Sequence, residues 1–293
     1  MAGKVAFAFL VVLTTSLMGS SFAVGKIGLG YVSPLLLVGI RFTVAGLLMI
    51  AIVKLLKRPT PNTLKDWLRI FCIGSFQTAG VMGAIFLSLR TITAGESAIL
   101  TFMNPLLVVV FGTLALGIRY RMIQWAGVFF GFIGVAVTMG FHLQLEIGTA
   151  FGVFSAISWA IATLLIKRWG DRLDTWVLTA YQMLFGGCLL LLGSAFLENA
   201  RLDLNAASVA IILWLAIPAS IVQFAVWFYL LQKGNPGKVS AFLFLAPFFG
   251  VISGWWLLGE PVGYTLVSGG SLIFIGIFLV NWPDKQVVES IAK

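Results

Sequence analysis

The stretch Gly95–Ile118, "GESAILTFMNPLLVVVFGTLALGI", decides the fold because its pattern returns later in the chain. The second copy, "GKVSAFLFLAPFFGVISGWWLLGE", begins at Gly237, 142 positions further on. Both copies are apolar, and each carries a proline near its middle, Pro105 or Pro247, which removes a backbone hydrogen bond from a helix. Earlier parts of the two halves align at an offset of 141. The sequence therefore predicts a duplicated unit of apolar helices.

The composition is that of a membrane protein. Of 293 residues, 60% are hydrophobic and only 10% are charged, and the mean hydropathy is +1.05. The charges are clustered and leave apolar runs of about 20 residues, the length that a helix needs to cross the hydrocarbon core. The alternating segments of a transmembrane barrel are absent. We predict an all-α integral membrane protein with ten transmembrane helices, at approximately 5–26, 33–54, 68–90, 93–115, 121–140, 147–167, 175–197, 207–231, 236–258 and 264–282.

The basic residues predict how the chain is oriented. Fifteen of the 19 lysines and arginines fall on the side of the N-terminus, and three, Lys26, Arg90 and Arg201, fall on the opposite side. This asymmetry predicts that both termini are cytoplasmic. It also accounts for the formal net charge of +9, so no nucleic-acid partner is expected. The predicted location is the plasma membrane, which is the inner membrane if the source is a bacterium.

Each half of the chain carries five predicted spans, an odd number. The second half must then enter the membrane upside down relative to the first, an architecture known from transporters. The predicted domains are a five-helix repeat at 1–141, a second, inverted five-helix repeat at 142–283 and a cytoplasmic tail at 284–293. Inverted halves suit a device that opens alternately to two faces of the membrane.

Three short motifs resemble those of a known family. Ser33–Leu36 is similar to its second-helix pattern, Leu258–Pro261 to its closing motif, and Gly19–Phe22 to its first-helix pattern. Together with the duplication they resemble the EamA family of the drug/metabolite transporter superfamily and, within it, the YddG amino-acid exporters. The resemblance implies ten helices, a central substrate cavity and export of small metabolites, amino acids foremost, including aromatic or other apolar ones.

The chain departs from the family pattern at two positions. Met18 replaces the usual tryptophan of the first-helix motif, and Ile118 replaces the usual glutamate of the first-half closing motif, although Glu260 keeps it in the second half. Neither change touches the predicted architecture. Both weaken the transfer of exact substrate contacts to this chain.

Other functions are less consistent with the sequence. Within the superfamily, the alternative substrate is a drug-like compound, a nucleotide sugar or another metabolite, but a phosphorylated one would need several basic groups at mid-depth. A channel would need a polar ring or filter. An enzyme would need a nucleophile with a base, or metal ligands. The single histidine, His142, lies in a connection, and Cys72 and Cys188 lie in apolar runs. We therefore expect no enzyme activity, metal, disulfide or cofactor.

Arg41 is the only charged residue well inside a predicted span. Ionisable residues within a membrane are costly and mark functional sites. Arg41 either has a structural role, paired with a helix C-terminus or with Glu96, or attracts a substrate carboxylate. Glu96 opens the span at 93–115, where the helix dipole stabilises a carboxylate, or else it titrates in proton coupling. With no other carboxylate inside a span, facilitated diffusion or exchange is at least as well supported as proton antiport.

Polar side chains in the middle of the spans form the candidate substrate site. Each can serve simply as a hydrogen bond between helices. Several cluster near the bilayer midplane, however, where transporters bind substrates between their repeats. The aromatic members would stack on an apolar side chain, and the amides would hold an amino or carboxylate group. The candidate substrate-binding residues are Gln77, Thr101, Asn104, Trp159, Thr163, Tyr181, Gln182 and Gln223.

The remaining candidates concern gating and assembly. Pro105 and Pro247 occupy matching positions and are predicted to be paired hinges, whereas Asn104 has no counterpart because Ala246 stands at the aligned position. Asn104 is thus where the two halves diverge toward a specific ligand. The small-residue pair Gly127 and Gly131 permits close helix packing, which we expect within one chain. The partners expected for a protein that functions as a monomer are a small-molecule substrate and the lipid bilayer.

Overall fold

The computed structural model describes residues 2–117, 120–138, 146–233, 242, 245–280 and 282. Among these residues the chain is helical apart from short connections and an isolated β-bridge between Val32 and Leu202. The α-helices are α1 (Ala2–Gly28), α2 (Pro34–Leu55), α3 (Leu64–Gly74), α4 (Val81–Ser88), α5 (Ala94–Phe102), α6 (Asn104–Leu116), α7 (Met122–Thr138), α8 (Ile147–Trp169), α9 (Thr175–Leu197), α10 (Ala206–Ala216), α11 (Gln223–Lys233), α13 (Leu245–Leu258) and α14 (Tyr264–Val280). Three further helical segments are η1 (Ser75–Gly80), η2 (Gly170–Arg172) and η3 (Ile217–Val222).

The helices confirm an all-helical membrane fold. Among the described residues, seven continuous helical stretches are long and apolar enough to cross a membrane, and three shorter apolar helices accompany them at Met122–Val137, Leu245–Leu258 and Tyr264–Val280. The start of the predicted span at 236–258, the residues Ile118 and His142, and the predicted tail at 284–293 lie outside the described residues.

The helix predicted to start at residue 68 begins at Leu64. Thr63 caps it, because its hydroxyl oxygen accepts a hydrogen bond from the backbone N–H of Asp66 at 3.2 Å. The sequence pattern Thr63–Asp66 indicates a cap at this place, which the structure confirms, whereas hydropathy alone puts the start of the helix at residue 68.

Two spans are interrupted by π-helical segments at matching positions. The first runs α3–η1–α4 and the second α10–η3–α11, and η3 begins 142 positions after η1. In η3, Pro218 lacks the N–H that an α-helix would use, and the Ser220 hydroxyl donates to the Leu215 carbonyl at 2.9 Å. Such π segments free backbone groups and occur frequently at functional sites.

The span at 93–115 is also broken, where Met103 separates α5 from α6. Pro105 lies in the first turn of α6, a position where the missing proline N–H costs little. Farther on, α6 ends at Gly117, whose φ of 64° is the left-handed conformation that favours glycine. Gly259 follows α13 with the same φ, 142 positions later.

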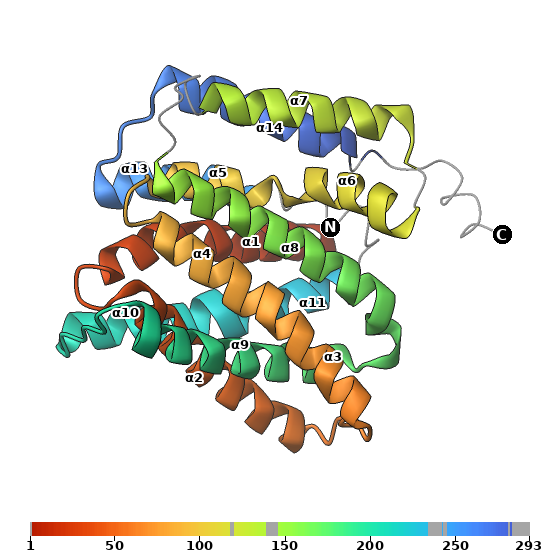
Figure 1. Ribbon diagram of the computed structural model, residues 1–293, viewed down its shortest axis with the longest axis vertical. Helices are drawn as coiled ribbons and strands as arrows, with labels where there is room; N and C mark the ends of the chain where they lie inside the picture. The colour runs from red at the N-terminus through yellow and green to blue at the C-terminus, as the bar shows by residue number, and fades with distance from the viewer. Residues whose placement is uncertain are drawn as a thin grey trace.

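Two helix pairs pack closely through glycines, as Figure 1 shows for α7 against α14 at one edge and α2 against α9 near the other. A Cβ built on Gly127 would lie 2.5 Å from the Gly276 carbonyl oxygen, and one on Gly134 would lie 2.7 Å from that of Gly269. Because only glycines allow backbones this close, Gly127 serves packing within the chain.

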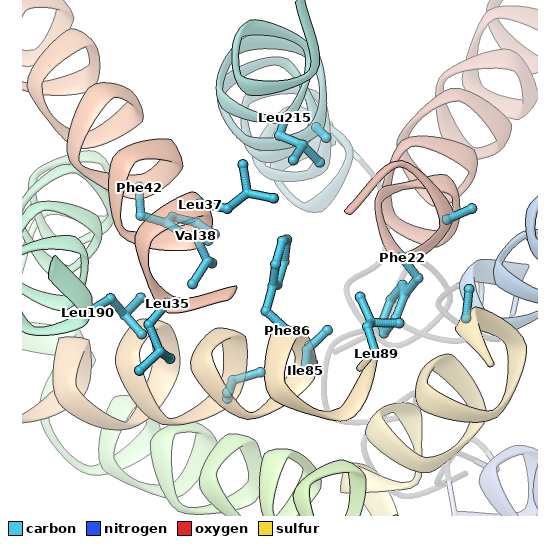
Figure 2. Close-up of a cluster of buried hydrophobic side chains, with 14 of the residues drawn as sticks. Phe22, Leu35, Leu37, Val38, Phe42, Ile85, Phe86, Leu89, Leu190 and Leu215 are labelled. Carbon is cyan, nitrogen blue, oxygen red and sulfur yellow. The ribbon is translucent and has the colours of Figure 1, made fainter. Parts of the chain in front are cut away.

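The largest apolar core joins the α2–α9 pair to the centre of the molecule, whereas α7 and α14 pack with α6 in a second core. Figure 2 shows Phe86 of α4 pointing between Leu37 and Val38 of α2 on one side and Phe22 of α1 on the other, with Leu215 of α10 beyond its ring. Elements from both halves of the sequence therefore share one core. This core forms one wall of the cavity described next.

Candidate substrate cavity

A small internal cavity of about 40 Å³ lies where α1, α2, α4, α5, α8 and α11 converge. That volume suits a few water molecules, whereas pockets for small-molecule ligands usually reach at least about 300 Å³. In this conformation the space is thus too small for a substrate. The lining residues are Met18, Ser21, Phe22, Arg41, Met82, Ile85, Phe86, Phe102, Trp159 and Gln223.

Arg41 brings a buried positive charge to this apolar cavity. Its side chain is held by η3: Nε donates to the Ser220 hydroxyl oxygen and Nη2 donates to the Ala219 carbonyl, both at 3.0 Å. Its guanidinium also lies 4.7 Å from the centre of the Phe42 ring. A guanidinium has five N–H donors, so three remain without a hydrogen bond to the described residues. No carboxylate among those residues forms an ion pair with Arg41.

A second polar contact occupies the position that the sequence repeat aligns with this one. The Thr78 hydroxyl of η1 donates to Gln182 Oε1 of α9 at 2.6 Å, and both side chains are buried. Thr78 precedes Ser220 by 142 residues, and Arg41 precedes Gln182 by 141. In both halves a π-segment hydroxyl bonds to a helix of the other half, but Thr78 donates to an amide oxygen, whereas Ser220 accepts from a charged guanidinium.

Aromatic side chains form the apolar part of the cavity. The rings of Trp159 on α8 and Phe102 on α5 are 5.3 Å apart, and both line the cavity. Met18 on α1 also lines it and is the residue that the repeat aligns with Trp159. Gln223 adds a buried amide next to η3. The cavity therefore combines a cation, an amide and an aromatic wall, a set that suits a carboxylate attached to an apolar group.

The structure brings three of the predicted polar residues, Arg41, Trp159 and Gln223, to the cavity and places the others elsewhere. Thr101 shares a 2.7 Å hydrogen bond with Ser155 of α8. Thr163 donates to the Trp159 carbonyl of its own helix, and Gln182 accepts from Thr78. Tyr181 packs edge-on against Trp67, with 4.7 Å between the ring centroids, and Gln77 is half-buried within η1.

Asn104 begins α6 at the break in its span and does not line the cavity. Its side chain is 8% exposed and forms no hydrogen bond to the described residues. Pro105 lies beside it in the first turn of α6, and Pro247 lies within α13. Both prolines are thus near the beginning of a described helical segment.

Glu96 caps its own helix. Its carboxylate accepts from the Thr93 backbone N–H at 2.9 Å, and its backbone N–H donates to the Thr93 hydroxyl at 3.0 Å. This reciprocal capping box accounts for a carboxylate at the start of α5. Neither predicted partnership, Glu96 with Arg41 or with a proton path, appears among its contacts.

An ion pair between Lys26 and Glu260, which are not among the polar candidates from the sequence, lies at one end of the molecule. Lys26 Nζ lies 2.7 Å from Glu260 Oε1 and also donates to the Ile92 carbonyl at 2.9 Å. Both Glu260 oxygens accept from the Ala94 N–H, at 3.0 and 2.9 Å. The contact joins the end of α1, the start of α5 and the segment after α13. Its sequence signal was the family-like closing motif that contains Glu260.

Comparisons with known proteins agree with this arrangement. A model of the EamA-like transporter family matches residues 6–140 and again residues 146–282. The chain is 30% identical to the uncharacterized transporter YvbV of Bacillus subtilis, over 95% of this chain and 91% of that protein. It is 27% identical to a protein of Salmonella typhimurium named probable amino-acid metabolite efflux pump, over 92% and 93% of the two chains. One solved crystal structure aligns with a TM-score of 0.63 at 21% identity, covering 97% of this chain and 98% of its own, a likeness of fold.

Proposed function

Because the chain belongs to the EamA-like transporter family and is a multi-pass protein of the plasma membrane, we propose that it exports amino acids by alternating access. The observation that carries the substrate class is Arg41, a buried guanidinium with free donors at a mostly apolar cavity. A substrate carboxylate would satisfy those donors. The name of the Salmonella relative supports an amino-acid metabolite as the cargo and efflux as the direction.

Ten spans in two inverted repeats are the topology that best supports alternating access. The three shorter apolar helices would complete the seven longer ones, and the basic residues favour cytoplasmic termini. The two successive family matches support repeats at 1–141 and 142–283. The matching positions of η1 and η3 also support these repeats. So do two glycine contacts, Gly127 with Gly276 and Gly134 with Gly269, because the repeat exchanges one contact for the other. Swapping the conformations of two such halves exchanges the open face.

The closed cavity would be the occluded stage of this cycle. A ligand would enter when helices on one face separate, and α1, α5, α8 and α11 all contribute side chains to the cavity. Two of these spans are already interrupted, by η3 before α11 and by Met103 after α5. Bending at these interruptions would break few backbone hydrogen bonds. Pro105 and Pro247 are proposed as hinges of these movements, in a chain that functions as a monomer.

Transport is proposed to be passive or by exchange rather than driven by protons. Glu96, the carboxylate that the sequence suggests for proton coupling, is held by the hydrogen bonds of its capping box. In the loop before α10, the hydrogen bond from Arg201 holds the pKa of the Asp203 carboxyl below its ordinary value, so this acid stays ionised at neutral pH. The contacts of Glu96 thus support a structural role at the start of α5.

Uptake into proteoliposomes tests the proposed function. Purified protein should accelerate uptake of several radiolabelled amino acids, with saturation, over protein-free vesicles. The corresponding decarboxylated amines should not be transported, because they lack the group that Arg41 would bind. Imposing a pH gradient at fixed substrate should leave the initial rate unchanged. A steep rise with the gradient would contradict passive transport, and unsaturable flux would point to a channel.

Replacing Trp159 by alanine should change selectivity more than folding. Trp159 supplies the aromatic wall beside Phe102, so its loss should raise the KM for aromatic amino acids about tenfold, the worth of one aromatic contact. The KM for alanine should change little. Tyr181→Ala is the matched control, since Tyr181 packs against Trp67 away from the cavity. Equal effects of both variants on every substrate would remove Trp159 from the site.

A further inference from the structure

Four basic side chains surround a hollow of about 520 Å³ at the end of the molecule where α3 begins and α8 ends. Lys65 and Arg69 stand one helical turn apart on α3, and Arg168 and Arg172 are likewise four residues apart at the end of α8 and in η2. On α3 this spacing puts Lys65 and Arg69 on one helix face, and Arg168 and Arg172 line the same hollow from α8 and η2. Two pairs of cations therefore face the same space. None of these residues belongs to the substrate cavity.

The charge in this basic hollow is only partly neutralised. The Asp66 carboxylate binds Arg69 Nη1 at 2.7 Å and accepts from the Thr63 hydroxyl at the same distance. The nearby Asp174 pairs with Arg58 at 3.7 Å and caps α9, so its charge is directed elsewhere. With Asp171, which precedes Arg172 in the sequence, two carboxylates stand against four cations and leave an excess of positive charge that an anionic group would balance.

An aromatic and an apolar surface adjoin the hollow. Trp169 lines it, with the Arg69 guanidinium 5.9 Å from the ring, and tryptophan side chains favour the headgroup level of a membrane. On α3, Leu64, Leu68 and Phe71 are exposed by 76%, 58% and 42%, and their spacing forms one continuous stripe. The stripe begins beside the basic residues. A ligand with a charged head and an acyl chain would contact both surfaces.

We propose that the basic hollow binds the phosphate headgroup of an anionic phospholipid, with an acyl chain along the Leu64–Phe71 stripe. Basic pockets between transmembrane helices bind such headgroups, and juxtamembrane lysines and arginines attract anionic lipids. The apolar stripe favours a lipid over a soluble phosphate compound, which would use the cations alone. This site is independent of the transported substrate and of the proposed transport function.

Native mass spectrometry of the detergent-purified chain tests the site. Titration with dioleoyl phosphatidylglycerol should give binding about 600-fold tighter than dioleoyl phosphatidylcholine, from a factor of about five for each of the four basic residues. The double variant Arg168→Gln/Arg172→Gln should weaken phosphatidylglycerol binding about 30-fold on the same scale. Lys65→Gln alone should weaken it about fivefold, which keeps the test open if the double variant does not fold.

The matched control is Lys54→Gln/Lys57→Gln. It removes the same charge from exposed residues that do not line the hollow, and it should leave lipid preference near that of the wild type. Equal weakening in both double variants would overturn the proposal, because bulk charge would then account for binding. Equally tight binding of glycerol phosphate or inorganic phosphate would also overturn it, in favour of a soluble ligand.

Discussion

Arg41→Gln should raise the KM for a transported amino acid about 10- to 100-fold in proteoliposomes. A charge-assisted hydrogen bond is worth about 1.5–3 kcal/mol, and each 1.4 kcal/mol corresponds to about tenfold in affinity. Glutamine retains hydrogen-bonding capacity toward Ser220 and Ala219 but brings no charge to the cavity. The variant should therefore discriminate less between an amino acid and the amine that lacks its carboxyl group. This loss of discrimination is the readout that a purely structural arginine would not produce.

Two further variants separate binding from folding. Arg41→Lys keeps the charge and should recover part of the affinity, although it lacks the planar fork that binds a carboxylate in two places. Gln182→Ala removes the polar group at the aligned position on α9, where Gln182 only accepts from Thr78. It should lower stability without changing the preference for a carboxylate. Unchanged KM and unchanged discrimination in Arg41→Gln would show that Arg41 serves η3 alone.

Hydropathy and the repeat predicted the helical framework because both depend on long stretches of sequence. Twenty apolar residues form a helix in lipid whatever their order, since the backbone must bond internally. The π segments were not predicted. Ile217–Val222 is as apolar as the helix before it, and only Pro218 hints at an interruption there. Ser75–Gly80 is more polar than its flanks, but polar residues alone do not indicate a π segment. The geometry of both segments depends on hydrogen bonds to neighbouring helices.

The composition of the cavity was harder to predict, because depth in a span does not give the direction of a side chain. Thr101 and Trp159 belong to neighbouring helices, yet one is used in a helix-to-helix hydrogen bond and the other lines the cavity. Met18 was noted as a departure from a family pattern, while its alignment with Trp159 was the better clue. A polar residue within a membrane span is a candidate, but only packing decides its use.

The Lys26–Glu260 pair distinguishes the two ends of the molecule. We propose that the end of the molecule with this ion pair is external. Lys26 follows the first span, and the N-terminus before that span is predicted to be cytoplasmic. Repeat alignment pairs Lys26 with Lys167 and Glu260 with Ile118, a position outside the described residues. Isoleucine provides no carboxylate, so the other end lacks this ion pair at the aligned positions. The opposite end carries the Arg58–Asp174 pair, but at 3.7 Å and with an exposed Arg58, so the external end has the shorter and more buried charged contact.

Glu260→Gln should shift the population toward the outward-open state about 10- to 100-fold, because a charge-assisted contact of about 1.5–3 kcal/mol no longer closes that end. The measurement is the rate at which a membrane-impermeant maleimide labels Ser21→Cys, a cavity position, from outside the cell in a Cys72→Ser/Cys188→Ser background. Glu198→Gln is the matched control, because Glu198 also accepts backbone N–H groups at a helix start, those of Leu35 and Leu36 at the beginning of α2. It should leave the labelling rate unchanged. If Glu198→Gln accelerates labelling as much as Glu260→Gln, general loosening of helix ends explains the effect, and the ion pair does not act as a gate.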